Sequence, residues 1–503
     1  MMENVRQAET SKSIFRNIVY GFSTWIIPLI LSFFATRIIV KTLGDKDYGI
    51  YALVLGFIGY SFNFSFGRAI TKYIAEYRVS GENEKIKDVV SATFFINLAV
   101  GIFGVSIIIF ISKWLVVSVY QIEEANQEKT ILALHLAAAI VFFLMMSQIF
   151  NAVLQGIHRF DVYSNIFNLN TIVMLAGNIY LALNGYGFLG LLVWNLVISA
   201  LTCVIVAVIS KRLLPEFGIN LRLKPEVVKL VLVYSAGIIG YQILANLLML
   251  FERGWITRQL GAENLTYYVV PMLLSFYIHA FVSSIVLVVF PLASELKNNR
   301  EKLLRLYTKS TKIVCFFVFF MATTLMIESK LFLTLWLGAE FADKTYLLLI
   351  IHTVTFSLVA IQTVSWQMTE GLGYPGYNLI IFVICLIINV LLVVGLTPGY
   401  GNIGVAFGRL AGFGTMFFSI YYVEKWFFQR VQTIFWLKLI GALAVSAVFS
   451  AIVEKSIISY FQISWLTFVS ATICGGIIYC LILWVLGFIT DEEKLLVRRI
   501  LNR

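Results

Sequence analysis

Charged residues are scarce in this sequence. Only 13% of the 503 residues are Asp, Glu, Lys or Arg and 60% are hydrophobic, whereas soluble domains carry about 25% charged residues. Apolar runs of about 20 residues, each long enough to cross a bilayer as a helix, recur along the whole chain. The shortage of charge therefore excludes a soluble globular protein and predicts an integral membrane protein without a separate soluble domain.

Cysteine is also rare, and no two cysteines have the spacing of a redox or metal motif. The five cysteines all lie inside apolar runs: Cys203, Cys315, Cys385, Cys474 and Cys480. We therefore expect small core residues, with no disulfide and no metal site. The polar stretch before the first apolar run has no cleavage site after it, which predicts a retained span in place of a cleaved signal.

The positive charge is unevenly distributed between the loops. The formal net charge is +11, and of the 38 Lys and Arg residues 26 fall on the side that carries both termini and 10 on the other, with Arg68 and Arg409 inside spans. Basic residues concentrate in loops that stay in the cytoplasm. We therefore predict an even number of spans, both termini in the cytoplasm of a bacterial-type cell, and no nucleic-acid partner.

Motifs of common soluble and membrane enzymes are absent. No GxxxxGK[ST] motif occurs, which excludes hydrolysis of ATP at a P-loop. The longest loop on the side opposite the termini, Lys113 to Lys129, carries Glu123, Glu124 and Glu128. A membrane glycosyltransferase, ligase or polymerase needs a larger extramembrane pocket than this loop can build. Such an enzyme is the weaker alternative to a protein that is not an enzyme.

The apolar runs predict about fourteen transmembrane helices in an all-α polytopic membrane protein. They lie near 15–40, 48–78, 88–112, 130–155, 161–184, 187–211, 226–252, 265–291, 303–328, 344–369, 376–396, 401–424, 434–454 and 463–488. We expect an N-terminal six-helix lobe at 1–225, a C-terminal six-helix lobe at 226–425, and two additional helices with a cytoplasmic tail at 426–503.

Short motifs recur more than two hundred residues apart. The shifts are 217, 215 and 214 residues for three pairs: Leu43-Gly44 with Leu260-Gly261, Gln155-Gly156 with Glu370-Gly371, and Asn184-Gly185-Tyr186-Gly187 with Pro398-Gly399-Tyr400-Gly401. A repeat of six helices gives both halves the same topology. The repeat therefore predicts two bundles related by a pseudo-two-fold axis along the membrane normal, with a central cleft between them.

Polar side chains inside the apolar runs follow single helix faces. Polar groups within a bilayer are costly, so these faces indicate a substrate pathway. They combine arginine with uncharged hydrogen-bonding groups and few acids, which suits a sugar linked through a phosphate. The candidate binding residues are Arg37, Arg68, Arg253, Arg409, Ser65, Asn151, Gln155, Asn168, Gln242, Asn246 and Gln367.

The same residues also have purely structural explanations. Asn, Gln and Ser on a helix face form hydrogen bonds between helices, and arginines near span ends anchor a helix at the membrane interface. The candidates for coupling to an H⁺ or Na⁺ gradient are His279, Glu370, Asp161 and Glu252. Apart from a coupling ion, no cofactor is expected.

A set of motifs in a fixed order carries a family resemblance. In chain order they are Arg37 with Lys41-Thr42-Leu43-Gly44, Tyr48-Gly49-Ile50-Tyr51, Phe66-Gly67-Arg68-Ala69, Leu154 to Phe160, the two Gly-Tyr-Gly hairpins, and Leu335-Trp336-Leu337-Gly338. Over essentially the whole chain the sequence resembles the polysaccharide flippases, of O-antigen, exopolysaccharide and teichuronic-acid type, of the multidrug/oligosaccharidyl-lipid/polysaccharide (MOP) exporter superfamily.

The resemblance implies a function by alternating access. It implies a flippase that moves an undecaprenyl-diphosphate-linked oligosaccharide across the cytoplasmic (inner) membrane, with membrane lipids and polysaccharide polymerase or assembly proteins as further partners. In the related lipid II flippases, cavity arginines are associated with the diphosphate and two extra C-terminal helices form a groove toward the lipid. By position, Arg37, Arg68 and Arg253 are the candidate arginines here, and the last two predicted helices resemble that addition. The alternatives are a lipid II flippase and a multidrug or cation exporter of the same superfamily.

Overall fold

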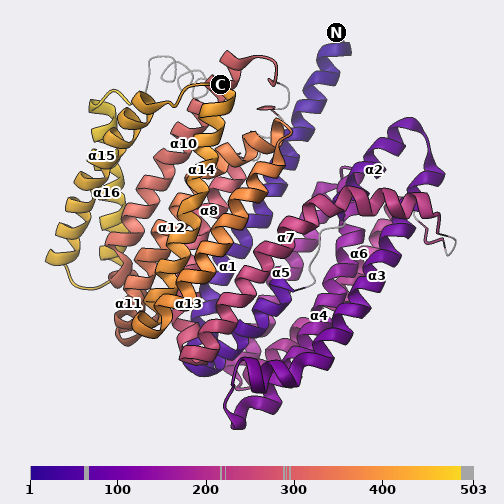
Figure 1. Ribbon diagram of the computed structural model, residues 1–503, viewed down its shortest axis with the longest axis horizontal. Coiled ribbons are helices and arrows are strands. Elements are labelled where there is room, and N and C mark those ends of the chain that lie inside the picture. Colours follow the sequence, from indigo (N-terminus) through magenta and orange to yellow (C-terminus); the bar gives the residue numbers. More distant parts are fainter. Residues whose placement is uncertain are drawn as a thin grey trace. The chain divides into compact units, whose positions relative to one another are not determined.

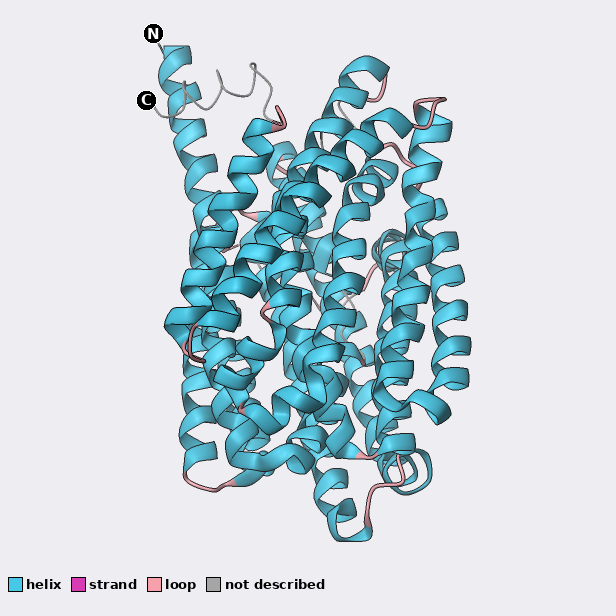
Figure 2. Ribbon diagram, turned by 90° about the vertical axis from the view of Figure 1, so that its left-hand side faces the viewer, coloured by secondary structure: helices cyan, strands magenta, loops and turns pink. Residues whose placement is uncertain are grey.

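The protein is built almost entirely of helices. The computed structural model describes residues 2–61, 67–215, 218–220, 223–286, 289, 292–293 and 296–488, and within these ranges there is no strand (Figure 2). Eleven of the described helices are long and apolar enough to cross a membrane. The all-α polytopic fold predicted from the sequence is therefore confirmed.

The chain forms two compact units, Met1–Thr266 and Tyr267–Arg503 (Figure 1). The helices of the first unit are α1 (Met2–Tyr60), α2 (Gly67–Ser80), α3 (Asn83–Trp114), a π-helical turn (Leu115–Val119), α4 (Glu124–Gly156), α5 (Phe160–Leu183), α6 (Gly187–Leu213) and α7 (Pro225–Leu260). Helix α8 (Ala262–Val286) begins in the first unit and continues into the second. The second unit continues with α10 (Arg300–Ile327), α11 (Ser329–Leu337), α12 (Ala339–Gly371), α13 (Pro375–Gly414), a 3₁₀ turn (Thr415–Phe417), α14 (Phe418–Tyr422), a π-helical turn (Val423–Phe427), α15 (Thr433–Tyr460) and α16 (Trp465–Val485).

Every predicted span contains a helix. Two of the eleven membrane-crossing candidates each cover two predicted spans, because α1 breaks at Gly44 and α13 breaks at Gly401 without ending. Helix α7 accounts for the remaining predicted span. The predicted span 48–78 consists of the second part of α1 and of α2. The lobe boundaries at 225 and 425 stay predictions, because the compact units are defined by packing and α7 packs on α1 and α3.

The repeat is visible in the backbone itself. Four pairs of residues with positive φ occur at the shifts of the sequence motifs, namely Gly44 (76°) with Gly261 (91°), Gln121 (51°) with Gly338 (112°), His158 (58°) with Gly373 (90°), and Gly187 (63°) with Gly401 (55°). The separations are 217, 217, 215 and 214 residues. Because left-handed backbone is uncommon outside glycine, its recurrence at matched helix junctions indicates that the two halves turn their chains in the same way.

The first pair of these junctions meets in a reciprocal contact. A Cβ added to Gly49 would lie 1.8 Å from the carbonyl oxygen of Ala262, and the Thr266 hydroxyl donates to the carbonyl of Asp45 at 2.5 Å. Residues 45 and 262, and likewise 49 and 266, are separated by 217 positions, which is the repeat shift. Each partner of one contact therefore has its repeat counterpart in the other, as in a self-complementary two-fold interface.

The core of the first unit is formed where α2, α3, α4 and α6 meet. Ile70 and Ile74 of α2, Ile86 of α3, and Met145 and Ile149 of α4 are fully or almost fully buried in one cluster. The Thr71 hydroxyl lies 3.2 Å from the Ala152 carbonyl oxygen and links α2 to α4. Helix α1 packs along α5 and α7, which belong to the same unit.

In the second unit, α12 packs against α10, α11 and α13, and the α15–α16 pair packs on α10. Figure 1 shows α15 and α16 side by side with α10 next to them. The Tyr479 hydroxyl of α16 donates to the Phe316 carbonyl of α10 at 3.0 Å. Large apolar side chains such as Leu466 and Trp484 of α16 are exposed, as expected for a surface that faces lipid.

Glu424 connects three elements of the second unit. Its Oε1 accepts from the Tyr307 hydroxyl at 2.8 Å and from Trp436 Nε1 at 2.6 Å, and its Oε2 accepts from the Gln432 amide at 2.7 Å. The side chain is buried. This carboxylate therefore holds the start of α15 against α10.

Glu424→Ala is expected to destabilise the protein by about 3 kcal/mol, because three donors lose their shared acceptor in a buried place. The measurement is the thermal unfolding midpoint of the purified protein in detergent. Glu301→Ala is the matched control, since its ion pair with Arg305 is exposed and is expected to contribute less than about 1 kcal/mol. Equal midpoints for the two variants would contradict the structural role of Glu424.

Candidate functional site

Arg253 is a buried cation on α7. Its side chain is 8% exposed, its Nη1 donates to the backbone carbonyl of Ala52 in α1, and its Cζ lies 5.5 Å from the centre of the Tyr60 ring. Its Nε has no hydrogen-bond partner among the described residues, and none of their carboxylates forms an ion pair with it within 4.0 Å. A guanidinium has five N–H donors in a planar fork, so Arg253 keeps donors for an anion.

The packing of α7 on α1 explains why Arg253 is held in place. The guanidinium lies beside the second half of α1, which is continuous from the Gly44 break to Tyr60. One backbone carbonyl and one aromatic face offset part of the cost of burying the charge. A bound phosphate would supply the counter-charge that these groups do not.

Arg37 lies on α1 and is half-buried. It belongs to the first part of this helix, before the break at Gly44. Ser65 and the side chain of Arg68 lie outside the described residues. Of the three arginines matched by position to a diphosphate site, the structure therefore gives contacts for Arg253 and the partial burial of Arg37, on two helices that pack together.

The uncharged candidates of the first unit are distributed over three helices. Asn151 and Gln155 of α4 and Gln242 and Asn246 of α7 are half-buried, and Asn168 of α5 is buried. Half-buried amides retain surface that a sugar hydroxyl can reach, whereas a buried amide serves packing between helices. Among these five residues, the partial exposure on α4 and α7 fits ligand contact better than the burial of Asn168 does.

Arg409 lies on α13 in the second unit and is 1% exposed. Its Cζ is 5.4 Å from the centre of the Phe356 ring and 5.2 Å from that of Phe413, and its Nη1 is 3.2 Å from the sulfur of Met272. These contacts enclose the guanidinium in aromatic and sulfur groups. Gln367 on α12 is half-buried.

The four ion-coupling candidates have different surroundings. Asp161 forms a two-pronged ion pair with Arg159, with Nε–Oδ1 at 2.9 Å and Nη2–Oδ2 at 3.0 Å, at a partly exposed position. Glu252 is buried and Glu370 is half-buried. His279 is half-buried, with its Nε2 3.3 Å from the Ser283 hydroxyl.

Besides Glu424, two further buried acids that the sequence analysis did not single out lie in the second unit. Glu328, between α10 and α11, and Glu454 of α15 are both 0% exposed. A signal for Glu454 was present, since Leu443, Ser446, Ser450 and Glu454 share one helix face and all four are buried. For Glu328 no such signal exists, because it ends an apolar run as an interfacial residue would. The described residues contain no group of three or more His, Cys, Asp or Glu side chains that could hold a metal ion.

The sequence is similar to one protein family and to one curated protein, and the names of both concern polysaccharides. The profile of a family described as "Polysaccharide biosynthesis protein" matches residues 38–345. A protein of Shigella flexneri named as an O-antigen transporter is 21% identical over 397 residues, which cover 78% of this chain and 93% of that protein.

Solved structures share the fold at low sequence identity. A lipid II flippase, MurJ, in an inward closed conformation superposes with a TM-score of 0.77 at 15% identity, over 93% of this chain and 99% of that one. An inward-facing multidrug resistance MATE family transporter of the MOP superfamily superposes with a TM-score of 0.67 at 16% identity, over 82% of this chain and 98% of that one. These structures establish the similarity of fold.

Proposed function

This chain belongs to the polysaccharide biosynthesis protein family and is a multi-pass membrane transporter with the fold of the MOP superfamily, and from that premise we propose that it flips an undecaprenyl-diphosphate-linked oligosaccharide. The oligosaccharide would pass from the cytoplasmic to the outer leaflet of the cytoplasmic membrane by alternating access. Both termini would lie in the cytoplasm, as the distribution of basic residues predicts. The proposed cycle changes no covalent bond, so the protein acts as a transporter and not as an enzyme.

Arg253 is the observation that carries this proposal. A buried guanidinium that keeps free donor capacity fits a diphosphate, because phosphate oxygens accept two parallel N–H bonds from the fork. The half-buried amides Gln242 and Asn246 lie on the same helix, about three and two turns before Arg253, respectively. One helix therefore presents a cation for the diphosphate and amides for sugar hydroxyls.

Leaflet exchange in vesicles tests the proposal. The full-length protein is reconstituted with an undecaprenyl-diphosphate oligosaccharide that carries a fluorophore on the sugar, and a membrane-impermeant reductant is added outside. We expect protein-containing vesicles to lose nearly all fluorescence and protein-free vesicles to lose only the outer-leaflet half. Loss limited to the outer leaflet in both preparations would overturn the proposed function.

Lipid II is the second candidate substrate, and the fold likeness to a lipid II flippase over 93% of this chain favours it. Both substrates carry a polyprenyl diphosphate, so Arg253 serves either one. The same vesicles loaded with fluorescent lipid II decide between them: faster exchange of lipid II than of the oligosaccharide carrier would assign the protein to peptidoglycan precursor transport.

A further inference from the structure

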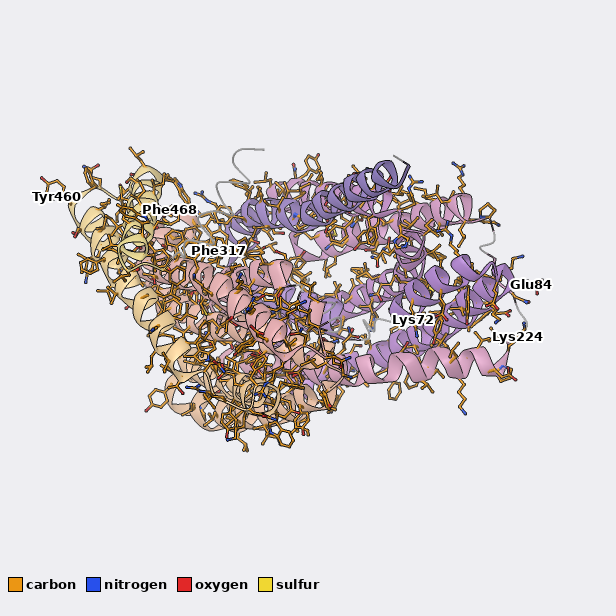
Figure 3. The ribbon with its side chains drawn as sticks, turned by 90° about the horizontal axis from the view of Figure 1, so that it is seen from above. Lys72, Glu84, Lys224, Phe317, Tyr460 and Phe468 are labelled. Atoms are coloured by element: carbon orange, nitrogen blue, oxygen red, sulfur yellow. The ribbon has the colours of Figure 1, made fainter. Side chains whose placement is uncertain are left out.

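Two buried carboxyls of the second unit lie between α10, α15 and α16. The Thr324 hydroxyl of α10 and the Ser450 hydroxyl of α15 donate to Glu454 Oε1 at 3.0 Å and 2.9 Å. The Thr472 hydroxyl of α16 lies 3.0 Å from Glu328 Oε2. Figure 3 labels Tyr460 and Phe468, which mark the end of the α15–α16 pair at which these groups lie.

The contacts place the two carboxyls within about one helical turn of each other. Thr324, which contacts Glu454, lies four residues before Glu328, so the two residues lie on the same face at the end of α10. On α16, a Cβ added to Gly475 would lie 2.3 Å from Glu454 Oε1, and Gly475 follows Thr472 by three residues. Glu454 and Glu328 are therefore held between the same turns of α10 and α16.

Each carboxyl has one satisfied oxygen and one buried oxygen without a partner. Among the described residues, nothing hydrogen-bonds to Glu328 Oε1 or Glu454 Oε2. Both side chains are 0% exposed. Two ionised carboxylates in such a place would repel each other and would both lack water, so the arrangement requires a positive charge that the surrounding side chains do not supply.

The charged groups nearest in sequence are directed elsewhere. Lys330 of α11 pairs with Asp343 of α12 at 2.6 Å and is largely exposed. Lys455, which follows Glu454 on α15, is exposed. The groups that face the carboxyls from α10, α15 and α16 are the hydroxyls of Thr324, Ser450 and Thr472 and the other carboxyl.

We propose that Glu328 and Glu454 form a proton-binding site in which the two carboxyls together hold one exchangeable proton, and that this proton is exchanged during transport. The proton lies on one of the two partnerless oxygens and removes one negative charge, so the two carboxyls no longer repel each other. The link to transport rests on the proposed function, whereas the binding of the proton does not. If the termini are cytoplasmic, the end of α10 lies toward the outer face, where a proton enters from outside.

Glu328 lies just beyond the span Arg300–Ile327. Burial raises the pKa of its carboxyl to about 8, the Thr472 hydroxyl opposes this rise, and the charge of Glu454 adds to it. The ordinary pKa of a glutamate carboxyl is 4.5. Between that pH and about 8, the folded protein therefore keeps the proton on Glu328, whereas the unfolded chain has released it. Stability is accordingly full at low pH and falls as the pH rises from there through about 8.

Thermal unfolding of the purified full-length protein between pH 5 and pH 9 tests the site. We expect the wild-type midpoint to fall with rising pH, and Glu328→Gln and Glu454→Gln each to reduce this fall by about half or more, because a neutral amide replaces the titrating acid. Glutamine has the size of a protonated glutamate, so both variants should fold. Glu340→Gln, at an exposed carboxyl paired with Lys344, is the matched control and should behave as wild type.

Two outcomes of this titration overturn the site. One is a wild-type midpoint that does not change between pH 6 and pH 9, and the other is an unchanged pH dependence in both glutamine variants. Thr472→Val provides an independent check: it removes the donor that favours ionised Glu328, so the fall in stability should extend to higher pH. No change in the pH range of the fall would count against the assignment.

Transport under an imposed pH gradient tests the exchange of the proton. Wild-type leaflet exchange is expected to respond to the gradient, and the two glutamine variants should exchange at a rate that does not. A wild-type rate that ignores the gradient overturns the coupling. If no preparation exchanges the labelled carrier between leaflets, the proposed function is wrong. The unfolding titration would still decide whether the proton site exists.

Discussion

Gly49→Ala is expected to destabilise the protein by about 4 kcal/mol or more, which is near the upper limit for a single added methyl group. The new Cβ would lie 1.8 Å from the Ala262 carbonyl oxygen and 2.5 Å from its carbon. Both atoms belong to backbone at the start of α8, so neither can move away as a flexible side chain would. The expected result is a sharp loss of monodisperse protein after extraction and a much lower unfolding midpoint.

Gly59→Ala is the matched control for this prediction. It makes the same chemical change in the same helix, at a glycine whose added Cβ would meet nothing within 4 Å. Alanine favours helix over glycine by up to about 1 kcal/mol, so this variant should be as stable as wild type or more so. A Gly49→Ala midpoint equal to that of Gly59→Ala would refute the close approach of α1 and α8.

Arg253→Ala is expected to lower the rate of leaflet exchange about 10- to 100-fold. Hydrogen bonds to a charged group contribute about 1.5–3 kcal/mol, and each 1.4 kcal/mol corresponds to about tenfold. Arg253→Lys should recover only part of the rate, because an ammonium keeps the charge but lacks the planar fork that engages two phosphate oxygens. The measurement is the fluorescence assay with the oligosaccharide carrier.

Arg258→Ala distinguishes a binding role from a general effect of charge on α7. Arg258 is an arginine of the same helix with an exposed side chain, and its loss should leave the rate within about twofold. The unfolding midpoint of Arg253→Ala must be measured in parallel, because Arg253 also donates to the Ala52 carbonyl. Equal exchange rates for Arg253→Ala and wild type would remove the central support for a diphosphate site at this residue.

The helices themselves were predictable from the sequence. Their lengths follow from apolar runs that match the bilayer thickness, and the repeat follows from motifs such as Leu43-Gly44 and Leu260-Gly261. The family followed from the order of the motifs. In the sequence, Tyr48-Gly49-Ile50-Tyr51 served only as a family motif. The structure shows why this motif contains a glycine: Gly49 packs directly against the Ala262 carbonyl, which leaves no room for a side chain.

The candidate site was predictable only in residue type. The sequence places Arg409 inside a predicted span and Arg253 directly after one. The structure places Arg253 against α1 with an Nε that has no partner among the described residues, and it encloses Arg409 between Phe356 and Phe413. The difference depends on neighbouring helices, and the spacing along one helix contains no information about them.

The sequence alone determined that this protein lies in a membrane, that its two halves share a topology and that it resembles a family of polysaccharide biosynthesis proteins. These properties depend on hydrophobicity, periodicity and local motifs, which are readable along the chain. Only the tertiary structure decided which polar groups meet. Glu328 looks like an interfacial residue, and the helix face that Glu454 shares with Ser446 and Ser450 does not show which partner it meets. These two acids are 126 residues apart, yet α10, α15 and α16 bury them together. Burial and pairing are properties of packed helices, and for that reason the proton site became visible in the fold and not in the sequence.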